Sequence, residues 1–193
     1  MRSALVALSI SLLTAAFPVR AEDWIVYEDC KLIPSEYFDG DSFHVKTKSY
    51  RYIFRLYYVD TPELNRDVPE RISDQAEYFG VSEERILEVA EEAREFTRKF
   101  LSGGFAVFTR KQDAWGKSSK KRYFAMIKAG DKYLSEALIE NGLARLYGYR
   151  VDLPNGKRWK KYLADLKVAE KAAKRSNKGG WAPVPEQSTV RGK

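Results

Sequence analysis

The chain has 193 residues, with 34 Lys and Arg, 27 Asp and Glu, one His, one Cys and a formal net charge of +7. One cysteine excludes an internal disulfide and multi-Cys zinc or iron–sulfur sites, and one histidine excludes paired-His metal sites, so any metal site here must use mainly oxygen ligands. The length suits one domain, and the positive charge suggests an anionic partner. Cys30 is either a buried free thiol or an intermolecular pairing site.

The first 21 residues have the pattern of a secretory signal peptide. Arg2 gives a positive start, residues 3–19 are uncharged and mostly apolar, and Val19-Arg20-Ala21 suits cleavage before Glu22. The alternative is an uncleaved membrane anchor, although the uncharged stretch is somewhat shorter than the ~20 residues that a spanning helix needs. We therefore expect removal of residues 1–21, export to the periplasm or the extracellular space, and no stable membrane association afterwards.

Residues 24–60 have the composition of β-strands. Residues 24–27 are an apolar run, and residues 43–48 alternate between apolar and polar side chains. Residues 50–59 are rich in aromatic and β-branched side chains and contain no Gly or Pro, which predicts one long central strand. Asp39-Gly40-Asp41 lies between the first two runs and is typical of a turn, so we expect a hairpin.

The rest of the chain, from residue 64 onward, contains a candidate loop, helices and further strands. Residues 64–81 are polar and irregular and predict a long loop. Ser82 is a candidate cap for a helix whose apolar stripe runs from Ile86 to Phe100 at three- and four-residue spacing. The remaining expected elements are strands at 105–110 and 123–128, a short helix at 133–141 and a last helix that stops at Gly179-Gly180.

This series contains about five strands, one helix after the third strand and one or two helices at the end, without strand–helix alternation or an internal repeat. It predicts an α+β fold with a small, strongly curved sheet or barrel. The expected organisation is a signal peptide over residues 1–21, one domain over residues 22–181 and a flexible tail over residues 182–193.

Two short acidic segments flank an arginine in the first half of the chain. Asp39-Gly40-Asp41-Ser42 enters a strand, Asp60-Thr61-Pro62-Glu63 leaves one, and Arg55 lies within an apolar strand, where an unpaired guanidinium is costly to bury. In a hairpin-based sheet these strand ends can be neighbours. Two carboxylates with backbone carbonyls and water suit Ca²⁺ or Mg²⁺. The alternative is that the aspartates only form turns and that Arg55 pairs internally.

These segments resemble the opening signature of the staphylococcal nuclease, or thermonuclease-like, family, which is Asp-Gly-Asp-Thr, Phe-Arg-Leu and Val-Asp-Thr-Pro-Glu. The chain has Asp39-Gly40-Asp41-Ser42, Phe54-Arg55-Leu56 and Val59-Asp60-Thr61-Pro62-Glu63 in the same order. Residues 92–97 and 133–144 are similar to the first two helices of the family, so the resemblance covers roughly 34–181. It implies a five-stranded OB-fold β-barrel with about three packed helices.

The resemblance also implies a Ca²⁺-dependent phosphodiesterase that acts on DNA and RNA, with single-stranded or frayed substrates preferred, and we expect a monomer. Asp41 and Asp60 would hold Ca²⁺ with the help of the Thr61 carbonyl. Glu63 would orient or deprotonate the attacking water, and Arg55 would contact the phosphate. The alternative is a non-catalytic OB-fold module that binds nucleic acid, but such degenerate copies lose the carboxylates and arginines that this chain keeps.

The position of the second catalytic arginine departs from the family pattern. Matching Trp115-Gly116 to the Tyr-Gly pair of the family would place Lys117 at that position. Matching the strand Tyr123-Phe124-Ala125 would place Arg122 there, with additional residues in the preceding loop. We favour Arg122, because strand register fixes a side chain more firmly than loop spacing does and because guanidinium geometry is preserved.

Three aromatic residues are candidates for stacking on nucleotide bases. Tyr147 and Tyr149 lie shortly after the second helix, where the family has its stacking tyrosines, although the spacing differs by one residue. Trp115 belongs to the presumed groove and is also able to stack on a base. Ordinary packing is the alternative for all three. His44 is expected to be solvated.

Overall fold

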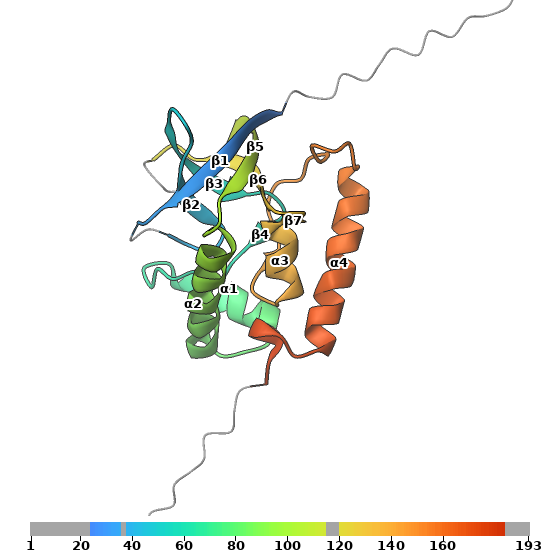
Figure 1. Cartoon of the computed structure of the whole chain (residues 1–193). Coiled ribbons are helices and arrows are strands. Elements are labelled where there is room, and N and C mark those ends of the chain that lie inside the picture. Colours follow the sequence, from blue (N-terminus) through green and yellow to red (C-terminus); the bar gives the residue numbers. More distant parts are fainter. Residues whose placement is uncertain (1–23, 36–37, 115–119, 184–193) are drawn as a thin grey trace, which may run out of the picture.

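Strand pairing in this protein closes a sheet into a barrel (Figure 1). The structure is a computed structural model that describes residues 24–35, 38–114 and 120–183. The barrel strands are β1 (Ile25–Ile33), β2 (Ser42–Lys46), β3 (Arg51–Leu56), β5 (Phe105–Asp113) and β6 (Tyr123–Ala129). Neighbours are antiparallel in the order β3-β2-β1-β5-β6, and the parallel pairing of β3 with β6 closes the ring.

The helices pack on one side of the barrel (Figure 1). They are α1 (Pro69–Phe79), α2 (Glu83–Phe100), α3 (Leu134–Glu140), α4 (Trp159–Arg175) and the 3-10 helix η1 (Gly179–Trp181). Three two-residue strands complete the described chain: β4 (Val59–Asp60), β7 (Lys132–Tyr133) and β8 (Arg145–Leu146). The expected α+β fold with a five-stranded OB-type barrel is confirmed, with four α-helices in the described residues instead of about three.

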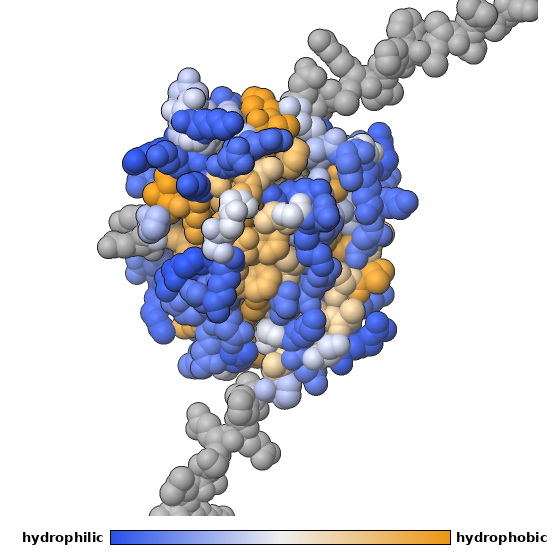
Figure 2. All heavy atoms as spheres, in the orientation of Figure 1, coloured by the Kyte–Doolittle hydropathy of each residue, from blue (hydrophilic) through white to orange (hydrophobic). Residues whose placement is uncertain are grey.

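The core fills the barrel and the space between the barrel and the helices. The alternation at residues 43–48 places Phe43, Val45 and Thr47 inside, each less than 5% exposed. Phe54 and Ile127 meet them from the facing strands and are also buried. Hydrophilic side chains cover most of the face shown in Figure 2, and apolar side chains are visible mainly where strands and helices meet.

Several sequence expectations have no counterpart in the described ranges. The signal peptide, Trp115 and Lys117 lie outside them, as does the tail beyond residue 183. Within the described ranges, none of the helices has the length and hydropathy needed to cross a bilayer.

The prediction of one long strand over residues 50–59 is wrong, because Tyr57 and Tyr58 separate two strands. β3 ends at Leu56, and Tyr58 adopts a positive φ of 75°. The chain then forms β4, which pairs with β8 and not with a barrel strand. The change of partner is invisible to local composition, because β-branched and aromatic residues suit both strands equally.

The long loop expected over residues 64–81 is also wrong, because most of it is helix α1. Pro69 stands in its first turn, and Gly80 ends it in the left-handed conformation with a φ of 71°. The buried face consists of Ile72, Gln75, Ala76 and Phe79. A glutamine in the centre of this face breaks the apolar stripe, which explains why the periodicity was not visible in the sequence.

Gly40 allows the first acidic segment to approach the second. A Cβ atom on Gly40 would lie 2.8 Å from Thr61 Cγ2 and 3.1 Å from the Cβ of Ala93. The Gly40 carbonyl accepts a hydrogen bond of 2.8 Å from Thr97 Oγ1 of α2. The loop before β2 therefore packs directly on Thr61 and on α2, and this contact leaves no space for a side chain.

We predict that Gly40→Ala lowers the free energy of unfolding by about 1–3 kcal/mol, since the added methyl must displace Thr61 or the loop. The control is Gly103→Ala, where a Cβ would meet nothing within 4 Å, and where the free energy should change by no more than about 1 kcal/mol, in the stabilising direction. Urea unfolding of both variants measures the difference. Equal stabilities would contradict the close packing of this loop.

Candidate functional site

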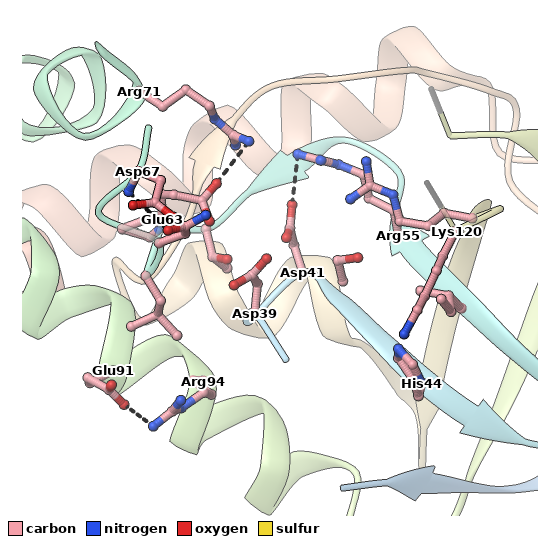
Figure 3. A pocket seen from close by; sticks show the side chains of 17 residues that line it. Asp39, Asp41, His44, Arg55, Glu63, Asp67, Arg71, Glu91, Arg94 and Lys120 are labelled. Atoms are coloured by element: carbon pink, nitrogen blue, oxygen red, sulfur yellow. Dashed lines mark hydrogen bonds and ion pairs between the residues drawn. The ribbon is translucent and has the colours of Figure 1, made fainter. Parts of the chain in front are cut away.

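A cavity of about 910 Å³ opens beside β2, β3 and α2 (Figure 3). The sequence-predicted residues on its wall are Asp41, Arg55, Thr61, Glu63 and Arg122. Asp60 lies underneath this wall with no exposed surface, in contact with Arg55. The structure therefore brings together the two acidic segments and both favoured arginines.

The register of β2 and β3 places Asp41 beside Arg55. Ser42 is directly opposite Arg55 in the ladder, and the Asp41 carbonyl accepts a hydrogen bond of 2.8 Å from the Leu56 amide. Arg55 Nη2 lies 3.2 Å from Asp41 Oδ2 and 2.7 Å from Asp60 Oδ1. One guanidinium thus bridges the two carboxylates that the sequence analysis assigned to a cation.

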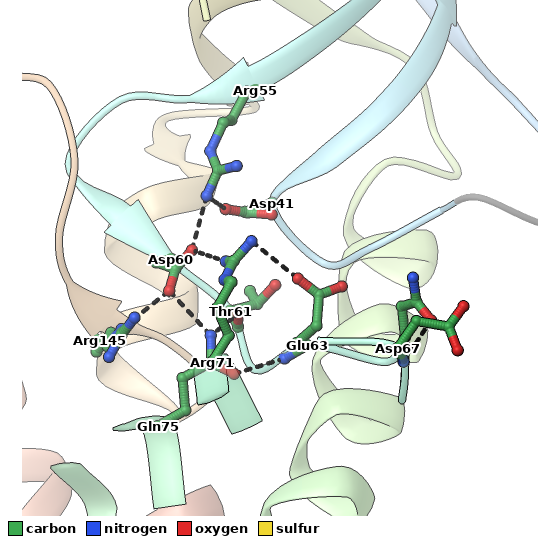
Figure 4. Close-up of polar contacts among 10 residues, drawn as sticks. Asp41, Arg55, Asp60, Thr61, Glu63, Asp67, Arg71, Gln75 and Arg145 are labelled. Atoms are coloured by element: carbon green, nitrogen blue, oxygen red, sulfur yellow. Dashed lines mark hydrogen bonds and ion pairs between the residues drawn. The ribbon is translucent and has the colours of Figure 1, made fainter. Parts of the chain in front are cut away.

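Asp60 is surrounded by donors from three other elements (Figure 4). Its Oδ1 atom accepts hydrogen bonds from Arg55 at 2.7 Å and from Arg71 of α1 at 2.8 Å. Its Oδ2 atom accepts bonds of 2.9 Å from Gln75 Nε2 and from Arg145 Nε. Arg145 reaches it because β4 and β8 pair with Asp60 directly opposite Arg145. These donors compensate the burial of the charge.

Glu63 lies on the same wall, and α1 holds it at two points. Its backbone amide donates to Gln75 Oε1 over 2.8 Å, and its Oε2 atom lies 2.9 Å from Arg71 Nη1. The Glu63 side chain is 11% exposed. A carboxylate oriented in this way at a cavity wall is able to accept a proton from a bound water.

Burial makes two aspartates of the cavity harder to ionise. Burial, together with the charges of Asp41 and Glu63, raises the pKa of Asp39 to about 7. Burial also raises the pKa of Asp41 to about 6, against the opposing effect of Arg55. Asp41 in turn raises the pKa of Arg55, whereas burial and the charge of Arg55 lower the pKa of Arg122. Additional positive charge at the aspartates would lower the cost of ionising them.

Asp41 and the Thr61 carbonyl fit a hard cation, whereas both oxygens of Asp60 already accept hydrogen bonds from other side chains. Among the described residues, no three His, Cys, Asp or Glu side chains form a metal-binding group, so a cation here would need backbone and water oxygens as well. The buried Asp41 Oδ2 atom has an ion pair with Arg55 but no well-oriented hydrogen bond within the described chain. The Thr61 carbonyl accepts one hydrogen bond, from Gln75 at 3.0 Å, and has a second lone pair available.

The two aromatic candidates within the described residues, Tyr147 and Tyr149, lie away from the cavity wall. Tyr147 and Tyr149 are 56% and 49% exposed and do not line the cavity. Tyr149 stacks on Phe124, with ring centroids 5.9 Å apart, and Arg145 covers the ring of Tyr147 at 4.8 Å. His44, which was expected to be solvated, is half-buried and lines the cavity (Figure 3).

Sequence reasoning missed Arg71, Gln75 and Arg145. Arg71 and Gln75 are four residues apart on one face of α1, the segment that was expected to be a loop. Arg145 is 85 positions from Asp60 in the chain. The only local signal was the four-residue spacing of Arg71 and Gln75, which places them on one face only if the segment is a helix.

A sequence model of the family described as Staphylococcal nuclease homologue matches residues 53–183. The match covers more than half of the chain and includes Arg55, Asp60, Glu63 and Arg122, whereas Asp41 precedes it. A search of the curated proteins found no match.

The raised pKa of Asp39 predicts a pH-dependent stability. The folded state keeps the proton up to about pH 7, whereas the unfolded state releases it near 3.8, so the protein loses stability as the pH rises through this window. Asn cannot ionise, so Asp39→Asn should gain about 3 kcal/mol relative to the parent between pH 4.5 and pH 8, or ~6–12 °C in Tm. Thermal unfolding in chelator at both pH values measures this, with the exposed Asp67→Asn as control. An identical difference at both pH values would contradict it.

Proposed function

This chain belongs to the family of staphylococcal nuclease homologues, and we propose that it is an exported, Ca²⁺-dependent nuclease that hydrolyses phosphodiester bonds in DNA and RNA without sequence specificity. The observation that carries the proposal is the position of Arg55, whose Nη2 atom contacts Asp41 at 3.2 Å and Asp60 at 2.7 Å. Glu63 lines the same cavity. The site thus combines paired carboxylates, a guanidinium group able to bind phosphate and a carboxylate able to act as a base.

Hydrolysis forms a bond between the water oxygen and phosphorus and breaks the bond from phosphorus to the leaving sugar oxygen. The attacking water must lose a proton, which Glu63 would accept, and the leaving sugar oxygen must gain one, which solvent would supply. Arg71 holds the Glu63 carboxylate at 2.9 Å, and Gln75 holds its backbone amide at 2.8 Å. This fixed orientation supports in-line attack, because a positioned base acts only within hydrogen-bond reach of its proton.

Negative charge accumulates on the phosphate oxygens during attack. Arg55 and Arg122 both line the cavity and present guanidinium groups, which can donate to two oxygens at once. The lowered pKa of Arg122 arises from burial and from Arg55, and it indicates two arginines close enough to repel each other. A bound phosphate would relieve that repulsion, which supports the role of these arginines as a clamp.

Asp41, Asp60 and the Thr61 carbonyl would hold the cation. When bound, Ca²⁺ would supply positive charge to a phosphate oxygen and to the attacking water. The excess of Lys and Arg in the chain supports nucleic acid as the substrate class, because basic side chains bind the phosphate backbone. Contacts to phosphate alone do not read the base sequence, which supports cleavage without sequence specificity. We also propose that Tyr147, Tyr149 and Trp115 assist by stacking on bases of single-stranded or frayed substrates, and that the enzyme acts as a monomer.

Export is proposed from the pattern of residues 1–21 alone. N-terminal sequencing of secreted material should begin at Glu22. A protein that begins at Met1 in that fraction would contradict cleavage of the leader.

Glu63→Gln should lower the rate of hydrolysis of single-stranded DNA in Ca²⁺ by about 10²–10⁴-fold, since the amide cannot accept the proton. The measurement is steady-state cleavage of a labelled oligonucleotide, which a chelator should stop in the parent protein. Binding of the oligonucleotide to Glu63→Gln, followed by fluorescence anisotropy, should persist.

The matched control is Glu91→Gln, because Glu91 lines the same cavity but forms an exposed ion pair with Arg94. Its activity should stay within about threefold of the parent. Unchanged activity in Glu63→Gln would refute the mechanism. Binding without cleavage by the parent in millimolar Ca²⁺ would favour the non-catalytic OB-fold module.

Arg122→Ala should lower kcat by about 10²-fold or more, because it removes a donor to the developing charge. Lys117→Ala should retain activity within about threefold, because the favoured alignment gives Lys117 no part in the phosphate clamp. Cleavage assays on the two variants decide between the two sequence alignments. Loss of activity in Lys117→Ala together with retention in Arg122→Ala would reverse the assignment.

A further inference from the structure

Gln75 occupies a position in α1 where an apolar residue would be expected. It has no exposed surface, and its neighbours on the buried face of the helix are Ile72, Ala76 and Phe79. Burying an amide is unfavourable unless its hydrogen-bonding groups find partners. The hydrogen-bond partners of the Gln75 amide therefore indicate why a polar side chain is buried here.

Each polar atom of Gln75 contacts a different part of the site (Figure 4). Nε2 donates to Asp60 Oδ2 over 2.9 Å and to the Thr61 carbonyl over 3.0 Å. Oε1 accepts from the Glu63 amide over 2.8 Å. The reverse orientation of the amide would place its oxygen against a carboxylate and its NH₂ group against an N–H, so the partners determine this orientation.

Helix α1, which carries this side chain, is anchored at its C-terminal end. Ser82 caps the adjoining helix α2, and Gly80 closes α1 with a hydrogen bond of 2.8 Å to the Ala76 carbonyl. Phe79 packs on Trp181 of η1, with ring centroids 4.5 Å apart. A side chain on such a support can fix the groups that it contacts.

We propose that Gln75 is a positioning residue of the hydrolytic site, which holds the Asp60 carboxylate, the Thr61 carbonyl and the Glu63 backbone in one fixed arrangement. The inference rests on the proposed function and extends it to a segment outside the predicted machinery. One amide connects both oxygen donors proposed for the cation to the proposed base. A shift of the helix would therefore disturb cation binding and proton transfer together.

The test replaces Gln75 with Met, which has a similar volume and a high helix propensity but lacks both the NH₂ donor and the carbonyl acceptor of the amide. In the full chain with a single-stranded DNA oligonucleotide and Ca²⁺, kcat should fall about 10- to 100-fold. KM should stay within about threefold, because Gln75 does not line the cavity. Isothermal titration with Ca²⁺ alone should show an affinity that is lower by about tenfold or more.

Ser135→Ala is the matched control, because it removes another buried hydrogen bond, the 2.9 Å contact of Ser135 Oγ with Tyr162 OH between α3 and α4. It should lower Tm and leave kcat and Ca²⁺ affinity unchanged. Gln75→Leu is the second variant, in case Gln75→Met does not fold. It is apolar and favours helix, it lacks the donors to Asp60 and Thr61 and the acceptor for Glu63, and it should also lose kcat and Ca²⁺ affinity.

Activity and Ca²⁺ affinity within threefold of the parent in either folded variant would overturn the proposal, as would an equal loss of kcat in Ser135→Ala. A parent protein that does not cleave would overturn the proposed function, and the Ca²⁺ titrations would still decide the role of Gln75. If the parent protein neither binds Ca²⁺ nor cleaves, both proposals fail.

Discussion

A carboxylate that is completely removed from water must be surrounded by donors, and Asp60 imposes this requirement on the fold. Arg55 from β3, Arg71 and Gln75 from α1, and Arg145 from β8 all donate to it at 2.7–2.9 Å. Removing one partner from such a buried pair typically costs about 3–5 kcal/mol, because the remaining charge is left uncompensated. Strand β3, helix α1 and the β4–β8 pair are thus tied to a single side chain.

The same pairing limits how a cation could bind to these carboxylates. Both oxygens of Asp60 already accept from arginines, and Arg71 also holds Glu63, so a cation at these carboxylates must compete with guanidinium groups. The Arg71 side chain is 40% exposed, whereas those of Arg55 and Arg145 are 15% and 12% exposed. Arg71 therefore has the most freedom to move away, while the other two arginines keep the buried charge paired.

Sequence reasoning worked where the signal is local. The alternation at residues 43–48 predicted which side chains face the core, and Ser82 caps α2 as expected, with its hydroxyl accepting from the Arg85 amide. It failed where a segment changes partner. Residues 50–59 have uniform strand composition but divide between a barrel strand and β4, because the backbone turns at Tyr58. The helix at residues 69–79 was missed because Gln75 interrupts its apolar face.

The sequence by itself determined which side chains are available to the site. Scarce His and Cys leave mainly oxygen atoms as possible metal ligands, and the two acidic segments lie close enough to Arg55 in the chain for one hairpin and one strand end to bring them together. Only the tertiary structure decided which groups balance these charges. Arg145 meets Asp60 from 85 positions away through strand pairing, and Arg71 and Gln75 reach it from a helix without an apolar signature. Such contacts depend on how elements pack, and packing between distant segments leaves no local periodicity in a single sequence.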